Sequence, residues 1–587
     1  GVYSGGLGVL SGDHCKAASD LGVPLVGVGL LYRSGYFRQT VDPDGFQQHI
    51  YPNYDFARLP VLPVQAPNGG VLTVPIDLPG RVVQAAVWKA QVGRVPVLML
   101  DTDIPLNDPA DRPITGMLYV RGREMRLCQE IVLGVGGVRA LSALGIHPSV
   151  WHMNEGHVAF LGLERARERV RSGDGLEEAL RMSARNTVFT THTPVPAGNE
   201  TFDKGLVRRY LDFLVREIGC EPDQLLSLGG ADNGSFNMTV LAIRLSTATN
   251  GVSKLHGQVS SAMWRHLWPG EPAEPVGAIT NGVHTPSWVG PEMRSLYAHA
   301  LDRDWEAHLV DPEHWKRIQA VPDEELWAAH RAQKERLVRF VRERVRQQSA
   351  RHGFSPDELR QIEGLLDPHA LTIGFARRFA TYKRAILLLT DVDRLRALLA
   401  DSARPVQILF AGKAHPADRD GQEAIRRLVV LTQGEFQGKV VFLEDYDIEM
   451  GRMLVQGCDV WLNTPRRPHE ASGTSGQKVP INGGINVSIL DGWWVEGYRA
   501  DNGWAIGDEH ADPDNAVQDL RDAESLYKVL EEEVVPLFYE RDDKDLPRRW
   551  IATMKNSIES VVAPFSAHRM VRDYVTTSYL PASTRRE

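Results

Sequence analysis

The chain has 587 residues, which is too long for one hydrophobic core and predicts two large domains or three smaller ones. Hydrophobic residues make up 43% and charged residues 24%, which is the balance of a globular enzyme and argues against a largely disordered chain. The formal net charge is -9, so the overall composition lacks the excess of positive charge that is typical of nucleic-acid-binding proteins. A small anionic ligand therefore has to be held by a local basic cluster.

The cysteines and the apolar runs narrow the class of protein further. Cys15, Cys128, Cys220 and Cys458 lie far apart without a CxxC pair, which argues against a zinc site or a disulfide framework and indicates a reducing, cytoplasmic location. No apolar run reaches the eighteen or so residues that span a bilayer, so no membrane partner is expected. The chain opens inside the glycine-rich stretch GVYSGGLGVLSGDHCK without an initiator methionine, and we interpret it as an N-terminally truncated fragment.

The first half of the chain mixes strand-like and helix-like patterns. GVLTVPIDLPG and VGRVPVLMLD are β-rich, whereas EMRLCQEIVLGVGGVRALSALG has helical spacing. We predict an α/β domain with a β-rich insertion over residues 1–290. The following stretch is charged at helical spacing and predicts a connector of surface helices over residues 291–365.

The second half repeats the order strand, loop, helix over residues 366–565. The short apolar runs TIGF, ILFAG, VVFLE and DVWLN are each followed by a polar loop, and the first three loops lead into amphipathic helices. This order is typical of a parallel, doubly wound sheet, in which ligands lie beyond the carboxyl ends of the strands. A last amphipathic helix is predicted over residues 566–587.

The loops after these four strands carry the candidate chemistry. ARRFATYKRA places four cations near one strand end, which is typical of either a phosphate site or a solvated helix start. FAGKAHP adds Lys413 and His415 beside a glycine, and LEDYD adds Tyr446 and carboxylates that also suit a helix cap. Taken singly, these loops leave both interpretations open.

The fourth loop contains EASGTSGQK. Gly473 and Gly476 permit unusual backbone angles, and the hydroxyl residues between them can face a ligand or cap a turn. Lys478 becomes a reactive amine only where burial or nearby cations depress its pKa. From this stretch alone, a capped turn with a surface lysine is the simpler interpretation.

Seven motifs in the same order resemble the α-glucan phosphorylases of the glycogen and starch phosphorylase family, in particular the bacterial members. They are YSGGLGVLSGDH, NEGHVAF, TTHTPVPAG, TNGVH, ARRFATYKRA, FAGKAHP and EASGTSGQK. The resemblance extends from Tyr3 to about Leu580. It implies a two-domain GT-B-type glycosyltransferase fold with Rossmann-like domains and covalently bound pyridoxal 5′-phosphate.

The resemblance also implies site residues, position by position. Lys478 matches the lysine that carries the cofactor, and Arg378 and Lys383 match a basic pair that binds substrate phosphate. The implied cofactor contacts besides Lys478 are Tyr446, Trp288, Thr474, Gly5 and Gly6. The implied contacts of the transferred glucose are Glu470, Ser472, Gly473, Asn281, Leu7 and His192, of which His192 is also expected to act in catalysis. No metal site is expected.

The reaction implied is retaining phosphorolysis, in which inorganic phosphate attacks the terminal glucose of an α-1,4-glucan and releases glucose 1-phosphate. The sequence offers no obvious pair of carboxylates for hydrolysis. The expected partners are the glucan and phosphate, with a homodimer as the candidate assembly. Ser475, Gly476 and Gln477 depart from the Gly-Asn-Met of relatives of the animal enzymes. The alternatives are a nucleotide-sugar-dependent glucan synthase of the same fold and an inactive glucan-binding homologue.

Overall fold

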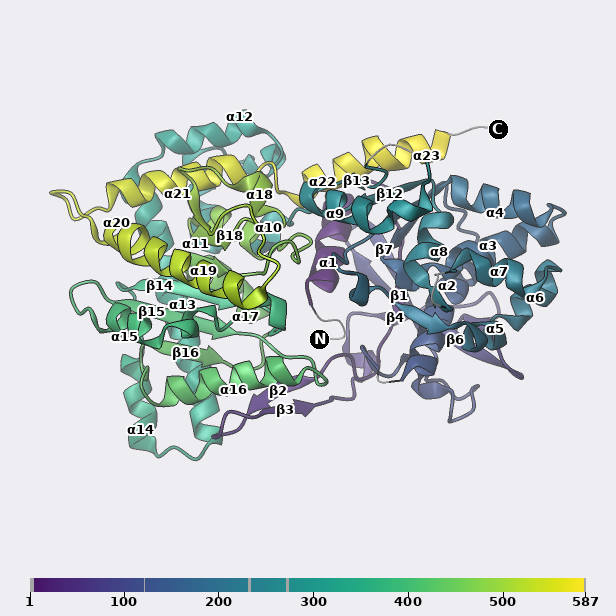
Figure 1. The fold of residues 1–587 in the computed structure, drawn as a ribbon, viewed down its shortest axis with the longest axis horizontal. Coiled ribbons are helices and arrows are strands. Elements are labelled where there is room, and N and C mark those ends of the chain that lie inside the picture. The colour runs from purple at the N-terminus through teal and green to yellow at the C-terminus, as the bar shows by residue number, and fades with distance from the viewer. Residues whose placement is uncertain (1–4, 121, 231–233, 271–273, 585–587) are drawn as a thin grey trace. The chain divides into compact units, whose positions relative to one another are not determined.

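The computed structural model describes residues 5–120, 122–230, 234–270 and 274–584, and its internal contacts divide the chain into two compact units (Figure 1). Unit 1 contains Gly1–Phe37, Tyr51–Thr280 and Met570–Glu587, and unit 2 contains Arg38–Ile50 and Asn281–Arg569. Each unit contains a parallel sheet with helices, so the α/β fold class predicted from the sequence is confirmed.

Unit 2 is built on a six-stranded sheet in which every neighbouring pair is parallel. Its strands are β14 (Leu371–Ala376), β15 (Val406–Ala411), β16 (Val440–Leu443), β17 (Val460–Asn463), β18 (Ile485–Ile489) and β19 (Gly503–Ile506). The strand order is β16-β15-β14-β17-β18-β19, so the winding direction reverses between β14 and β17. In doubly wound sheets this reversal opens a crevice at the carboxyl ends of the two strands, where ligands bind.

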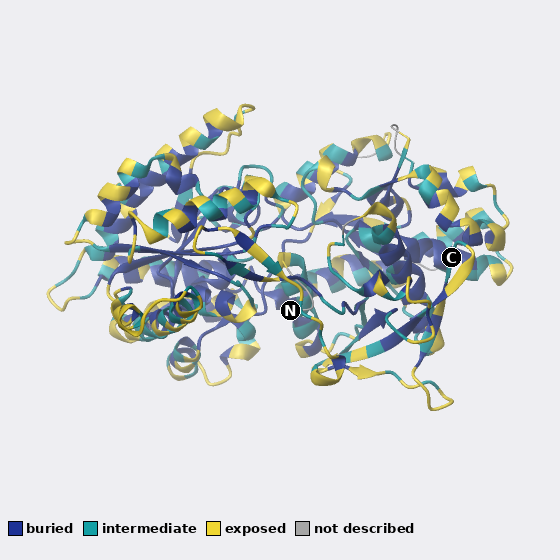
Figure 2. Cartoon of the chain, turned by 90° about the horizontal axis from the view of Figure 1, so that it is seen from below, coloured by how far each residue is buried: buried dark blue, intermediate teal, exposed yellow. Residues whose placement is uncertain are grey.

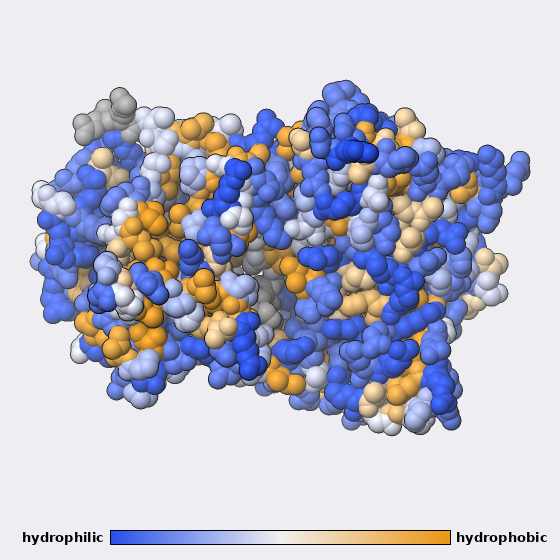
Figure 3. Space-filling view, turned by 180° about the vertical axis from the view of Figure 1, so that it is seen from behind, coloured by the Kyte–Doolittle hydropathy of each residue, from blue (hydrophilic) through white to orange (hydrophobic). Residues whose placement is uncertain are grey.

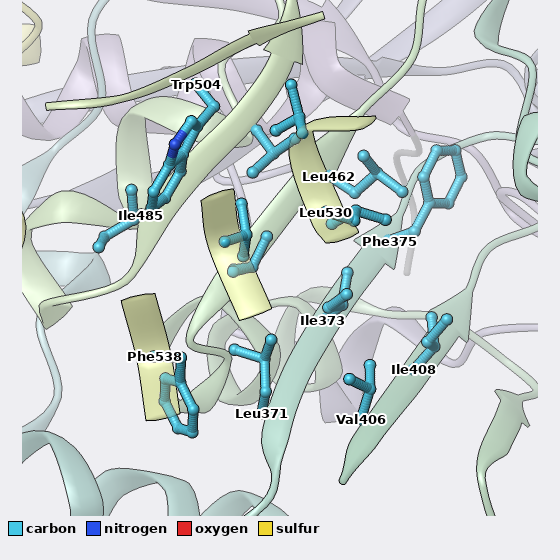
Figure 4. Packing of buried hydrophobic residues seen from close by; sticks show 14 of the residues in the cluster. Leu371, Ile373, Phe375, Val406, Ile408, Leu462, Ile485, Trp504, Leu530 and Phe538 are labelled. Carbon is cyan, nitrogen blue, oxygen red and sulfur yellow. The ribbon is translucent and has the colours of Figure 1, made fainter. Parts of the chain in front are cut away.

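The strands of this sheet are buried on both faces. Every residue of β14 to β18 is buried, which is the pattern of a parallel sheet covered by helices on each side (Figure 2). Figure 4 shows side chains of these strands, such as Leu371 and Ile373, in one cluster with Leu530 and Phe538 from later in the chain. The helices of unit 2 are α10 (Thr285–Trp288), α11 (Pro291–Ala300), α12 (Pro312–Trp315), α13 (Asp323–Arg351), α14 (Pro356–Gln361), α15 (Val392–Ala400), α16 (Arg419–Gln433), α17 (Ile448–Gly457), α18 (Trp494–Gly497), α19 (Asn515–Lys528), α20 (Val535–Tyr539) and α21 (Arg548–Val561).

Helix α13 lies within the region that the sequence predicts to be a connector. Its 29 residues form one long helix, and its buried face carries Leu326, Leu337 and the polar pair His330 and Lys334. Lys334 Nζ lies 2.5 Å from Asp459 Oδ2, and His330 Nε2 lies 3.0 Å from Asp459 Oδ1, with all three side chains almost fully buried. One face of the helix therefore packs into unit 2, and its other face is exposed. The many charged residues of the exposed face make the whole stretch look like a surface helix in the sequence.

A hairpin from the early part of the sequence also belongs to unit 2. Strands β2 (Arg38–Val41) and β3 (Gln47–Ile50) pair antiparallel and lie beside α16 (Figure 1). Gln39 Nε2 donates to the carbonyl oxygen of Gly412 at 3.0 Å, and Gln47 Nε2 donates to that of Ala414 at 3.0 Å. The hairpin thus holds the loop after β15, at the carboxyl edge of the sheet.

Unit 1 contains two larger sheets. The first is mixed and comprises β1 (Gly27–Leu30), β4 (Leu62–Pro63), β5 (Thr73–Leu78), β6 (Arg81–Val92) and β7 (Val95–Asp101). The second is parallel, with order β13-β12-β9-β8, and comprises β8 (Trp151–Asn154), β9 (Thr187–Thr190), β12 (Ala248–Gly251) and β13 (Gly277–Ala278). A further pair consists of β10 (Thr201–Asp203) and β11 (Ser235–Asn237). The antiparallel β5, β6 and β7 correspond to the predicted β-rich insertion.

Helices pack against these sheets, and the described part of the tail, to Thr584, is helical. The helices are α1 (Gly5–Asp20), α2 (Arg123–Ala143), α3 (Phe160–Arg171), α4 (Leu176–Arg185), α5 (Lys204–Tyr210), α6 (Asp212–Ile218), α7 (Pro222–Leu228), α8 (Met238–Arg244), α9 (Lys254–Trp264), α22 (Ala567–Asp573) and α23 (Leu580–Thr584). Tyr574, which follows α22, bonds through its hydroxyl to Thr190 Oγ1 and Asn250 Nδ2. These bonds fix the C-terminal helix to the parallel sheet of unit 1.

The molecular surface is largely hydrophilic, with scattered apolar patches on the face seen from behind (Figure 3). Leu62 and Leu106 in unit 1 and Leu520 in unit 2 are more than 60% exposed. Exposed apolar side chains are normal in globular proteins, so exposure alone does not define a binding surface. Among the described helices, none is both long enough and apolar enough to cross a bilayer, and all four cysteines are free thiols.

The buried pair of Lys334 and Asp459 predicts a large stability effect. Replacing Lys334 by Met leaves the Asp459 carboxylate buried without its amine, so the free energy of unfolding of unit 2 should fall by about 3–5 kcal/mol. Urea denaturation measures this fall. The matched control is Lys316→Met, because Lys316 pairs with Glu313 at the exposed surface of the same unit and its loss should change stability little. Equal urea midpoints for the two variants would contradict the account.

Candidate active site at the carboxyl edge of the unit 2 sheet

The loop after β17 carries the lysine that the sequence singles out. The chain passes from β17 through Glu470 and Ser472 to a short 3₁₀ turn, Gly476–Lys478, before it enters β18. Lys478 is only 8% exposed, and its Nζ lies 3.9 Å from the centroid of the Trp288 ring. The lysine is therefore an interior residue, which excludes the simpler interpretation of a surface lysine on a capped turn.

Residues 281–290 dock against this turn through the backbone. Asn482 Nδ2 donates to the carbonyl oxygens of Trp288 and Lys478, both at 3.0 Å, and Asn482 Oδ1 accepts from the amide of Gly290 at 2.7 Å. The carbonyl oxygen of Asn482 in turn bonds to His330 Nδ1 on α13. The backbone of the lysine turn is thus held on two sides, by the segment that carries Trp288 and by α13.

A buried carboxylate joins two cations beside the same loop. Glu470 Oε2 lies 2.6 Å from Arg377 Nη2 and 2.9 Å from Lys383 Nζ, and each of the three residues is 8% exposed. Burial opposes the charged form of Glu470, but Arg377 and Lys383 outweigh it and lower the pKa of the carboxyl to about 2. Arg377 and Lys383 follow β14, whereas Glu470 follows β17, so the cluster lies at the reversal point of the sheet.

Arg377 is one of the four cations that the sequence places near this strand end, but the family resemblance assigns the phosphate contact to its neighbour Arg378. Arg378 is exposed, whereas Arg377 is buried and pairs with Glu470. Within the described structure, Arg377 Nη1 is a buried donor without a hydrogen-bond partner. Beyond β14 the backbone stays paired with the next segment, because the amides of Arg377 and Phe379 donate to the carbonyl oxygens of Ala411 and Lys413. Arg377 and Phe379 are therefore buried and Arg378 between them is exposed, an alternation that the sequence alone does not show. The role assigned to Arg378 stays a prediction.

The loop after β18 clamps the segment from Glu470 to Gly473. Asp491 Oδ2 accepts the amide hydrogen of Glu470 at 2.9 Å, and the amide of Trp493 donates to the carbonyl oxygen of Ser472 at 2.8 Å. Burial, with the nearby Glu470 charge, raises the pKa of Asp491 to about 8, although two backbone amides oppose the shift. Gly473 has φ +84°, where a side chain would strain the backbone. Asp491 was missed because a lone Asp-Gly reads as an ordinary turn.

Three further predicted residues, Thr474, Tyr446 and Asn281, are buried or half-buried in loops of unit 2. Thr474 is half-buried on the lysine loop, and Tyr446 is half-buried in the loop after β16. The Tyr446 hydroxyl packs against Gly451. A Cβ at position 451 would lie only 2.7 Å from this hydroxyl, so the glycine leaves the space that Tyr446 occupies. Asn281 is buried, and Gln477 Nε2 donates to its carbonyl oxygen at 2.9 Å. The structure therefore brings the lysine turn, Trp288 and Asn281 together within one unit.

His192, Gly5, Gly6 and Leu7 lie in unit 1. His192 follows β9, and its Nε2 donates to Asn154 Oδ1 at 2.7 Å, which leaves Nδ1 as an acceptor. Burial lowers the pKa of His192 to about 3, with a further contribution from nearby histidines, so the ring is neutral. Glu155 Oε2 accepts the amide hydrogen of His192 at 2.8 Å and ties the two motif loops together.

The glycine motif forms the start of α1. Gly5, Gly6 and Leu7 make up its first turn, and Gly5 has φ +76°. The amides of a first helical turn lack partners within the helix and suit an anion. The first residues of this motif, including Tyr3, lie outside the described residues.

The residues of unit 2 fit pyridoxal phosphate. A buried lysine beside an aromatic ring suits an imine linkage to an aromatic aldehyde. Arg377 Nη1 is a buried donor that a phosphate oxygen would satisfy, and the two buried cations Arg377 and Lys383 share one carboxylate, Glu470. The site can therefore hold an anion in a position shielded from water.

A parallel α/β unit with buried cations at the carboxyl edge of its sheet is typical of the proteins that bind an anionic or phosphate-bearing ligand there. Comparison with known proteins gives the family: the carbohydrate phosphorylase family matches residues 146–500. The chain is 46% identical to the maltodextrin phosphorylase of Thermococcus litoralis over 99% of this chain and 69% of that protein. It is 45% identical to the glycogen phosphorylase of Mycobacterium tuberculosis over 99% of this chain and 69% of that protein, and 40% identical to that of Aquifex aeolicus over 98% and 84%. The chain belongs to the carbohydrate phosphorylase family.

The ion pairs of Glu470 predict a pH-dependent stability. A carboxyl whose pKa falls from 4.5 to about 2 on folding stabilises the protein above pH 4.5, and this contribution is lost as the pH falls toward 2. Replacing Glu470 by Gln should lower the free energy of unfolding by about 3–5 kcal/mol at pH 7, because two buried cations lose their counter-ion. The difference from the unmodified protein should shrink below pH 4.5.

Urea denaturation at pH 7, 4 and 3 measures this difference. Glu313→Gln is the control, since Glu313 pairs with Lys316 at the exposed surface. If Glu470→Gln lowers the free energy of unfolding by the same amount at pH 7 and at pH 3, Glu470 is not ionised and paired with the two cations in the folded protein.

Proposed function

We propose that the chain is an α-1,4-glucan phosphorylase that uses inorganic phosphate to release α-D-glucose 1-phosphate from the non-reducing end of maltodextrin or glycogen. The observation that carries the proposal is the buried Lys478 on the same loop as Glu470, which pairs with Arg377 and Lys383. The names of the relatives, maltodextrin phosphorylase and glycogen phosphorylase, support this class of substrate.

We propose that pyridoxal 5′-phosphate is held by Lys478, with Trp288, Tyr446 and Thr474 around it and with the amides of Gly5 and Gly6 near its phosphate. When bound, this cofactor supplies a phosphate group that exchanges a proton with the substrate phosphate. Two phosphates repel each other strongly at close range, so Arg378, Lys383 and the unpartnered Arg377 Nη1 are needed to offset that repulsion.

The sugar is proposed to lie on the loop that Asp491 clamps. Glu470, Ser472 and Gly473 would orient its hydroxyls, with Asn281, Leu7 and the neutral ring of His192 as further contacts. Ser472 Oγ is buried without a partner in the described structure, so a sugar hydroxyl would satisfy it. The residues of the chain thus bind, orient and shield the sugar, while phosphate is the nucleophile. The homodimer and the cytoplasmic location stay predictions.

The proposed role of Lys478 is tested by phosphate-dependent release of glucose 1-phosphate from maltodextrin, with added pyridoxal phosphate. Lys478→Ala should abolish this release and the absorbance of bound pyridoxal, because the only covalent attachment is removed. Lys528→Ala is the control, since Lys528 is exposed at the end of α19, and it should retain both. An active Lys478→Ala protein that binds no pyridoxal would refute the proposal, as would glucan synthesis by the unmodified protein from a nucleotide sugar alone.

The proposed role of Arg378 gives a separate prediction. Arg378→Ala should raise the KM for phosphate by about ten-fold or more, because a charge-assisted hydrogen bond to the anion is lost. The KM for maltodextrin should change little. Initial rates over a matrix of phosphate and maltodextrin concentrations separate the two constants, with Arg404→Ala, an exposed arginine paired with Asp401, as the control. Equal increases in both constants would count against a phosphate contact.

A further inference from the structure

Gln477 stands directly before Lys478 and makes a contact that its position in the sequence does not indicate. The side chain is 3% exposed, and Nε2 donates to the carbonyl oxygen of Asn281 at 2.9 Å. The opposite orientation of the amide would bring its oxygen against that carbonyl oxygen, so the donor position of Nε2 is required. The hydrogen bond therefore fixes the direction of Oε1 as well.

The backbone of Asn281 is held firmly from its other side. Gly282 leaves no room for a side chain, since a Cβ there would lie 2.2 Å from the carbonyl oxygen of Ser566. Val283 donates its amide hydrogen to Phe565 at 2.9 Å and accepts from the amide of Ala567 at 2.7 Å. The carbonyl oxygen of Asn281 accepts from Gln477 at 2.9 Å and, more weakly, from Arg569 Nη2 at 3.4 Å, so the Gln477 bond is the shorter of two that hold Asn281.

Two buried acceptor atoms near this contact lack a hydrogen-bond donor among the described residues. Gln477 Oε1 and Asn281 Oδ1 are both buried, and neither has a hydrogen-bond partner among the described residues. A buried acceptor without a donor costs about 1–3 kcal/mol, so such groups are usually completed by a ligand or by water. A phosphate oxygen at neutral pH offers mainly lone pairs and cannot complete them. A hydroxyl group can, because it donates a hydrogen.

We propose that Gln477 is a specificity-determining residue whose Oε1 accepts a hydrogen bond from a hydroxyl of the transferred sugar, while its Nε2 holds Asn281 for the same ligand. This inference rests on the proposed function and extends it to a residue outside the predicted site. It also gives a role to a position at which the sequence departs from relatives of the animal enzymes. Water in place of the sugar hydroxyl is the alternative that the experiment has to separate.

The experiment measures binding of glucose 1-phosphate and of its 2-, 3-, 4- and 6-deoxy analogues by isothermal titration, without a glucan acceptor. It compares the unmodified protein with Gln477→Met, which keeps the bulk and removes both polar atoms, and with Gln477→Glu, which keeps an acceptor and removes the donor. Gln456→Met is the matched control, because Gln456 is a buried amide that also bonds to this segment, at Trp288, and has both polar atoms partnered.

Gln477→Met should weaken binding of glucose 1-phosphate by about ten-fold, which corresponds to one lost hydrogen bond. For the one analogue that lacks the accepted hydroxyl, the loss should shrink to about two-fold or less. Gln477→Glu should retain part of this discrimination even if Gln477→Met folds poorly. The control should weaken every sugar by the same factor.

An equal loss for all five sugars in both Gln477 variants would overturn the inference and favour water as the partner. The proposed function fails separately if the unmodified protein binds the sugars with the expected pattern but does not lengthen a maltodextrin acceptor with release of phosphate when given glucose 1-phosphate. The binding data and the turnover data thus distinguish the two failures.

Discussion

The ion pairs of Glu470 with Arg377 and Lys383 are the interaction on which the candidate site depends. Two cations cannot be buried together at a strand edge unless an anion offsets their charge. The carboxylate comes from the loop after β17 and the cations from the loop after β14, so the cluster forms only where the sheet reverses its winding. Among the residues that the structure describes, none offers Arg377 Nη1 a hydrogen-bond partner, so this donor can take a further anion.

The lysine turn is held by groups that surround it rather than by its own residues. Asn482 bonds to the backbone of Lys478 and Trp288, and its carbonyl oxygen reaches His330, which is itself paired with Asp459. A chain of buried polar contacts therefore runs from α13 to the lysine. Such an arrangement fixes the backbone that carries the lysine, and a held backbone is what catalysis by positioning requires.

Much of the fold follows from the sequence, because apolar strands, polar loops and amphipathic helices alternate plainly after residue 366. Lys478, Glu470 and Lys383 could also be singled out from the sequence, because the order of the motifs points to them. The burial of Arg377 and the exposure of Arg378 could not, because they depend on which side chain the backbone after β14 turns inward. Asp491 and Gln477 escaped for a similar reason: an isolated acid or amide carries no periodic signal, and its contacts are long-range. The buried face of α13 was hidden by the number of charges on its exposed side.

The proposed reaction depends on Lys478 as the residue that carries the cofactor. The most direct measurement is reduction of the protein with borohydride in the presence of pyridoxal phosphate, followed by peptide mapping by mass spectrometry. The account predicts one pyridoxyl group, located on Lys478, and its disappearance when Lys478 is replaced by arginine. Labelling spread over exposed lysines, with Lys478 unmodified, would contradict it.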